Sequence, residues 1–128
     1  SAIRTLTLQV YSVSDLAMRK LVLDFSYRTY FVHLACHLRE LWLRLDAARD
    51  RVDRGSGGSM DMGALQEADE QCKDLLMYCC DVLSLDVPGL GEALVERLLQ
   101  YAVFPLLLGS LFAAVPDEGS IEEEEEEE

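Results

Sequence analysis

The chain has 128 residues, half of them hydrophobic, which is enough for one domain with a modest core and too many for a disordered protein. Its net charge of −13 is concentrated at one end, because nine of the 24 acidic residues lie within 117–128. That leaves 15 acidic and 11 basic residues in 1–116, a net charge of −4 without a basic patch. A nucleic-acid partner requires such a patch, so the composition argues against one.

The first residue is Ser1, the apolar pattern starts at once, and the last seven residues are Glu. Both ends read as cuts, so we expect a fragment of a longer protein. The four cysteines (Cys36, Cys72, Cys79 and Cys80) do not have the spacing of a small secreted disulfide framework. Free thiols favour a reducing compartment, and we therefore expect a cytosolic location.

The first predicted helix covers residues 2–13. Its apolar side chains recur at three- and four-residue steps: Ile3, Leu6, Val10 and Val13. A break at residues 14–15 is followed by a short helix or loop to about Ser26.

Residues 27–53 predict the clearest helix, because one apolar stripe runs along its length. The stripe consists of Phe31, Leu34, Ala35, Leu38, Leu41, Trp42, Leu45, Ala48 and Val52. Trp42 is expected in the core, so Trp42→Ala is expected to unfold or strongly destabilise the chain. Polar side chains on the other side include His33, His37, Glu40, Arg44 and Arg51. The Gly-rich sequence that follows predicts a flexible loop over 54–62.

Residues 64–85 predict a second amphipathic helix. Its apolar face consists of Leu65, Ala68, Cys72, Leu75, Leu76, Cys79, Val82 and Leu83, and its acidic face of Glu67, Glu70, Asp74 and Asp81. After a turn at 86–89, residues 90–115 predict a further helix, which Pro105 kinks or splits.

The stretch 98–115 contains 18 residues without a charge, which is the lower limit for a membrane-spanning helix. We favour a buried helix, because the amphipathic helices before it need an apolar partner. The alternative is an integral membrane protein that spans the bilayer through 98–115.

Four or five helices with short loops, without the period-two alternation of strands, predict an all-α protein. Helices with one apolar face each suit a helical-repeat solenoid of the armadillo or HEAT type, of which 1–116 would be a fragment. Residues 117–128 predict an acidic disordered tail that acts as a spacer, although a run of Glu can also bind a basic partner or, weakly, a metal ion.

Candidate sites for chemistry are weak. His33, Cys36 and His37 share one side of a helix and offer three zinc ligands, but the sequence places no fourth ligand nearby, so we predict no metal. No cofactor motif and no catalytic constellation is recognised, so we predict no enzyme. One alternative remains, a ubiquitin-pathway component that carries a thioester on Cys80. The residues predicted to face partners are His33, His37, Glu40, Arg44, Glu67, Glu70, Asp74 and Asp81.

Four stretches carry a resemblance to a known family: IRTLTLQVYSV at 3–13, YFVHLACHLREL at 30–41, GALQEADEQCKDLLMYCCDVLSL at 63–85, and LVERLLQYAVFPLLLGSL at 94–111. In this order and spacing, across most of 2–112, the chain resembles the FPL-domain family. It departs from the family pattern in a shorter segment at 14–29, a Gly- and Arg-rich loop at 51–62, and the Glu run.

The resemblance implies a non-enzymatic helical-repeat scaffold in endosomal and Golgi-to-lysosome or vacuole traffic and in autophagy, including mitophagy. It also implies a cytoplasmic protein that is peripheral on endosome, Golgi and lysosome membranes. The expected partners are other proteins, either trafficking or ubiquitin-pathway factors. The family offers no catalytic residues to assign to this chain.

Overall fold

A computed structural model of the chain describes residues 1–55 and 58–114, which are helical without a strand. The elements are α1 (Ala2–Tyr11), α2 (Leu16–Phe25), η1 (Ser26–Tyr30), α3 (Phe31–Asp53), α4 (Ser59–Leu83), α5 (Leu90–Leu98), η2 (Leu99–Val103) and α6 (Phe104–Ala114). The segments η1 and η2 are π-helical and join their neighbours end to end, so these described residues form four continuous helices. The predicted all-α class is confirmed, and the solenoid classification stays a prediction.

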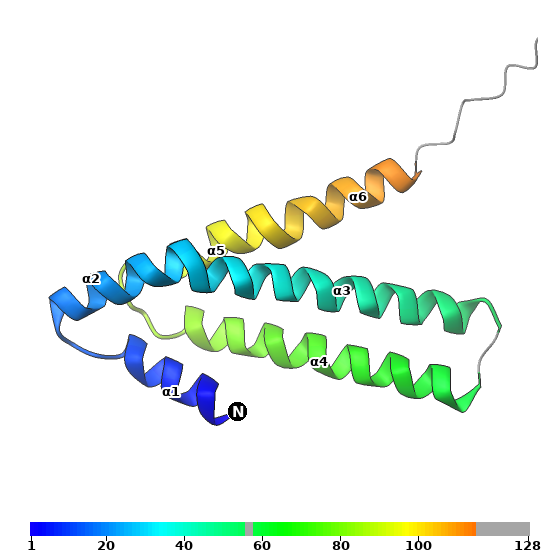
Figure 1. Ribbon diagram of the computed structural model, residues 1–128, viewed down its shortest axis with the longest axis horizontal. Coiled ribbons are helices and arrows are strands. Elements are labelled where there is room, and N and C mark those ends of the chain that lie inside the picture. The colour runs from blue at the N-terminus through cyan, green and yellow to red at the C-terminus, as the bar shows by residue number, and fades with distance from the viewer. Residues whose placement is uncertain (56–57, 115–128) are drawn as a thin grey trace, which may run out of the picture.

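The long helix α2–η1–α3 lies in the middle of the molecule (Figure 1). Helix α4 runs antiparallel to α3 on one side, and α5 packs against α3 on the other side. Helix α1 packs on α4 near the end of the bundle where α2 begins. The result is three helical layers with α3 as the shared central layer.

Local sequence explains where the helices begin. Ser1 Oγ accepts from the Arg4 amide at 3.4 Å, and Asp15 Oδ1 accepts from the Met18 amide at 2.8 Å, so both residues act as N-caps. Gly89 precedes α5 at a φ of +81°, a conformation that glycine adopts without a Cβ clash.

Two boundaries differ from the sequence prediction. Residues 16–25 form helix continuously with α3, where the sequence left a short helix or loop open. The predicted flexible loop 54–62 is shorter, because α4 begins at Ser59. The first turn of α4 includes Met60, Asp61 and Met62, which are compatible with a helix. Gly63 also lies within this helix. The predicted acidic tail 117–128 lies outside the described residues.

The core follows most of the predicted stripe on α3, in which Phe31, Leu34, Ala35, Leu38, Leu41 and Ala48 are buried. All of these except Ala48 belong to one core cluster with Cys72, Leu75, Cys79 and Val82 of α4 on one side, and Leu90 and Leu94 of α5 on the other. Trp42 is a correction, because its side chain is 43% exposed. It follows Leu41 by about 100° around the helix, which places it at the edge of the stripe. Leu76 and Leu83, predicted on the apolar face of α4, are also exposed.

The predicted burial of 98–115 is wrong for most of the described part of this stretch. Ala102 is buried, but the large side chains of α6 are exposed: Phe104, Leu107, Leu108, Leu111 and Phe112. Helix α5 and η2 pack on α3, whereas α6 packs chiefly on η2, to which it is joined. In Figure 1, α6 extends away from α3. Among the described residues, Leu90–Ala114 is the one helix whose length and composition would allow it to cross a bilayer.

Candidate interaction surfaces

All eight residues predicted to face partners are exposed. His33, His37, Glu40 and Arg44 follow one side of α3, and Glu67, Glu70, Asp74 and Asp81 follow α4. Arg44 and Glu67 line the same small pocket of about 300 Å³ between the two helices, so this pocket brings one member of each group together. The remaining six residues stay on their own helix surfaces.

The acidic surface of α4 is partly paired by its own neighbours. Gln66 Nε2 donates to Glu70 Oε1 at 3.1 Å, and Gln71 Nε2 donates to Glu67 Oε1 at 3.3 Å. These amide bonds leave the carboxylate charges in place. Glu67 and Glu70 therefore remain anionic groups that a basic partner can contact.

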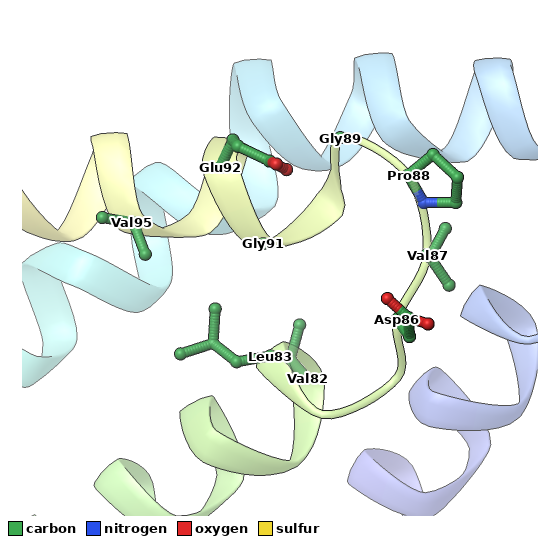
Figure 2. A pocket seen from close by; sticks show the side chains of 9 residues that line it. All are labelled: Val82, Leu83, Asp86, Val87, Pro88, Gly89, Gly91, Glu92 and Val95. Carbon is green, nitrogen blue, oxygen red and sulfur yellow. The ribbon is translucent and has the colours of Figure 1, made fainter.

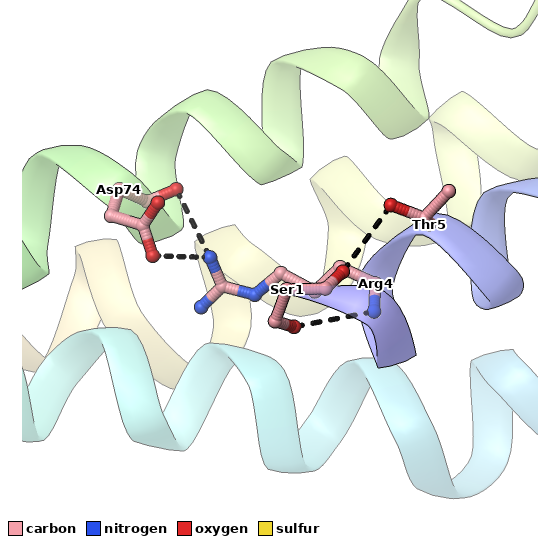
Figure 3. Close-up of polar contacts among 4 residues, drawn as sticks. All are labelled: Ser1, Arg4, Thr5 and Asp74. Atoms are coloured by element: carbon pink, nitrogen blue, oxygen red, sulfur yellow. Dashed lines mark hydrogen bonds and ion pairs between the residues drawn. The ribbon is translucent and has the colours of Figure 1, made fainter.

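Asp74 holds the N-terminal helix in position. Its carboxylate pairs with the Arg4 guanidinium at 2.5 Å (Figure 3). The same guanidinium lies 5.2 Å from the centre of the Tyr78 ring. Exposed pairs of this kind contribute about 0.2–1 kcal/mol. Asp74 is thus partly committed to a contact between α1 and α4.

Three tyrosines that the sequence did not single out form the polar part of the core. The Tyr11 and Ser26 hydroxyl groups share a hydrogen bond of 2.7 Å, and the Tyr30 and Tyr78 hydroxyl groups share another of 2.7 Å. Burial raises the pKa of Tyr11 to about 12, and burial together with the Tyr30 hydroxyl raises the pKa of Tyr78 above its ordinary value. Both phenols therefore stay neutral at physiological pH and act in packing.

The cysteines divide into two kinds. Cys72 and Cys79 are buried, and burial raises the pKa of both thiols, that of Cys79 to about 11. Such thiols are poor nucleophiles because they remain protonated. Cys80 is exposed and Cys36 is half-buried. The geometry leaves Cys80 accessible, as a thioester carrier requires, but places Asp81 next to it.

His33, Cys36 and His37 were the candidate metal ligands of the sequence. Within residues 1–55 and 58–114, no group of three or more His, Cys, Asp and Glu side chains is arranged to hold a metal ion. His33 and His37 are exposed on α3, whereas Cys36 is half-buried.

A pocket of about 390 Å³ lies at the turn between α4 and α5 (Figure 2). Asp86 and Glu92 are the ionisable residues that line it, beside the apolar side chains of Val82, Leu83 and Val95. Asp86 adopts a φ of +53°, which is uncommon for a non-glycine residue. Pro88 and Gly89 complete the turn. Two carboxylates without a basic or nucleophilic lining residue do not suggest a reaction.

A larger groove of about 610 Å³ lies between α1 and α2. Its exposed walls are apolar: Ile3, Leu6, Val10, Leu21 and Phe25. The sequence predicted the apolar residues of α1 but gave no reason to expect a groove there. The periodicity of one helix does not reveal how far a neighbouring helix covers its apolar side.

Two arginines that sequence analysis missed bind the long helices together at their π-helical segments. In η1 the Phe31 amide donates to the Ser26 carbonyl, five residues back. When the helix returns to bonds between residues four apart, the Tyr27 carbonyl is left without an amide donor from its own helix. Arg97 Nε of α5 donates to that carbonyl at 2.8 Å, and its guanidinium lies 3.9 Å from the centre of the Tyr27 ring. Tyr27 OH donates in turn to Glu96 Oε1 at 3.0 Å.

The second π-helical segment has the reverse arrangement. In η2 the Phe104 amide bonds to the Leu99 carbonyl, and Pro105 has no N–H to give to the Tyr101 carbonyl. Arg39 Nη1 of α3 donates to the Tyr101 carbonyl at 3.3 Å. We call Arg97–Tyr27 and Arg39–Tyr101 the arginine latches. Pro105 was the available sequence signal for the second latch, because it predicts a carbonyl without its helical donor.

Comparison with known proteins gives two distant relatives. Protein TRANSPARENT TESTA 9 of Arabidopsis thaliana is 30% identical over 123 residues, which cover 95% of this chain and 14% of that protein. Protein CLEC16A homolog of Drosophila melanogaster is 30% identical over 116 residues, which cover 90% of this chain and 10% of that protein.

The chain thus spans a small part of the length of the relatives it matches. No family model matches the chain, and no solved structure matches it. The two matches confirm the resemblance drawn from the four sequence stretches. The chain is a distant homologue of Protein TRANSPARENT TESTA 9 and Protein CLEC16A homolog.

Proposed function

We propose that the chain is a non-enzymatic interaction scaffold in endosomal and Golgi-to-lysosome (vacuole) membrane traffic and in autophagy. The observation that carries the proposal is the distant homology, which runs through 95% of the chain to one relative and 90% to the other. The resemblance to the FPL-domain family supplies the trafficking and autophagy role. On this proposal the protein is cytoplasmic and peripheral on endosome, Golgi and lysosome membranes.

The proposed mechanism is recognition of other proteins by the polar surfaces of α3 and α4. His33, His37, Glu40 and Arg44 are exposed on the first surface, and Glu67, Glu70 and Asp81 on the second. Their helices are held by the core on the opposite side, so the surfaces keep their shape when a partner binds. The net charge of −4 over 1–116 favours basic protein partners, and we propose no nucleic-acid partner.

The test is the location of the tagged protein in its own cells against endosome, Golgi and lysosome or vacuole markers. We expect puncta on these organelles that sodium carbonate extracts. The double variant Glu67→Lys, Glu70→Lys should weaken the puncta, whereas Asp46→Lys, an exposed control on α3, should keep them. A diffuse signal from the unchanged protein would contradict the trafficking role.

A second candidate is an integral membrane segment, and one observation favours it. Leu90–Ala114 is a continuous helix long and apolar enough to span a bilayer, and only 6% of its hydrophobic window is buried. Against it, Glu92, Glu96 and Arg97 occupy the first part of this helix, and Glu96 and Arg97 contact Tyr27. The same carbonate extraction separates the two candidates, because a spanning helix would leave the protein in the membrane pellet.

A further inference from the structure

Two apolar surfaces, which we consider together, are exposed within residues 1–55 and 58–114. One is the α1–α2 groove, with Leu6, Leu21 and Phe25 on its walls. The other is α6, whose side chains Leu108 and Phe112 are 53% and 76% exposed. Exposed patches of this kind in a folded protein indicate a binding surface.

The groove accepts an uncharged, apolar occupant. It contains no ionisable side chain except the phenols of Tyr11, which is buried, and Tyr30, which is half-buried. Each of its polar groups is already hydrogen-bonded within the chain: Thr7 to the Ile3 carbonyl at 2.9 Å, Tyr11 to Ser26, and Tyr30 to Tyr78. An occupant therefore finds no unpartnered polar group to match, and a charged group would lose its hydration without compensation.

Helix α6 has the chemistry that the groove requires. It has no charged residue, and it is apolar on all sides, which is typical of a helix buried in protein or in lipid. It has 11 residues, against 10 in each of α1 and α2, so all three helices are about 15 Å long. Residues 115–128 do not fit the groove, because nine of these 14 residues are acidic.

We propose that α6 of one copy of the chain docks into the α1–α2 groove of a second copy. The contact is head to tail, because it joins two different surfaces, so each copy keeps one groove and one α6 for further copies. It covers both exposed apolar surfaces with one interface. The proposal does not depend on a role in membrane traffic.

The test is the mass of the full chain in solution, measured by light scattering after size-exclusion chromatography over a range of concentrations. Leu6→Glu places a charge in the groove, and Leu108→Glu places one on α6; both side chains are exposed, so the fold should tolerate the changes. Met77→Glu is the matched control, since Met77 is 69% exposed on α4 and belongs to neither surface. Circular dichroism checks that all variants keep their helix content.

We expect the unchanged chain and Met77→Glu to rise above the 14.4 kDa mass of one copy with concentration, and each of the other variants to stay at that mass. A mixture of Leu6→Glu and Leu108→Glu should form a one-to-one complex that grows no further, because it combines one intact α6 with one intact groove. A monomeric unchanged chain, a monomeric mixture, or variants that associate like the unchanged chain would overturn the proposal. Transfer of a monomeric chain to phosphatidylcholine vesicles through α6 would overturn it in favour of lipid.

Discussion

Trp42 and Phe31 lie 11 residues apart on the same helix, yet their burial differs completely. Phe31 is 0% exposed and contacts the rings of Tyr11 and Tyr30, with centroid distances of 6.1 and 5.8 Å. We predict that Phe31→Ala lowers the free energy of unfolding by about 3–5 kcal/mol. Trp42→Ala should lower it by about 1 kcal/mol, because a large part of this side chain is already in water. Urea denaturation followed by circular dichroism measures both, and equal losses would show that Trp42 is a core residue.

The buried thiol of Cys79 predicts a loss of stability in alkali. Its pKa is about 11 in the folded chain, against an ordinary value of 9.0. Below pH 9 both states keep the proton; between pH 9 and pH 11 only the unfolded state releases it, so the free energy of unfolding falls as pH rises. The raised pKa of Tyr11 extends this fall toward pH 12.

The contribution of Cys79 is measured as the difference in urea midpoint between pH 8 and pH 10. We expect a smaller difference for Cys79→Ala than for the unchanged chain. Cys80→Ala, a change at the exposed neighbour, should keep the full difference. If Cys79→Ala also kept it, the alkaline loss would arise from other groups.

The arginine latches belong to the scale of whole helices, because each ties one long helix to the π-helical segment of the other. Arg39 replaces the amide donor that Pro105 lacks, so the effects of the two residues should be coupled. We predict that Arg39→Met lowers the free energy of unfolding by about 1–2 kcal/mol in the unchanged chain. In a Pro105→Ala chain the loss should be smaller, because the new amide can bond to the Tyr101 carbonyl.

A double-mutant cycle in urea measures this coupling. Arg28→Met serves as the control for Arg39→Met, because Arg28 pairs with Asp24 on the exposed surface of the same long helix, where such a pair contributes little. Additive losses for Arg39→Met and Pro105→Ala would show that Arg39 does not substitute for the missing donor.

At the scale of the molecule, the core is made by α1, the long helix α2–η1–α3, α4 and the segment α5–η2, and α6 adds little to it. A chain that stops after Leu106 should therefore keep the same free energy of unfolding, within about 0.5 kcal/mol, when urea denaturation is measured at low protein concentration. A chain that stops after Val95 should fail to fold, because it loses Arg97, Tyr101 and Ala102. Cooperative unfolding of the second variant would contradict this division of the core.

The sequence was sufficient for the helical class and for most of the α3 and α4 core, because a 3.6-residue pattern reports which side of a helix is apolar. It did not predict that Trp42 and α6 are exposed, because the same pattern does not show how much of the apolar side a neighbouring helix covers. The exposed residues of the proposed partner surfaces were predicted by the same periodicity. The tyrosine hydroxyl pairs and the arginine latches join residues 15 to 70 positions apart, and local patterns contain no information on such pairs.

The π-helical segments make each long helix one residue longer than a regular α-helix over the same path. Deleting the exposed Thr29 from η1 would restore regular bonding, but it would also rotate all preceding residues by about 100° relative to α3. Val22, Leu23 and Ser26 would then leave the core side. A regular α-helix through this segment would therefore place the wrong side chains toward the core. The extra residue in η1 disturbs the regular bonding and keeps the core residues of the preceding helix on the correct side.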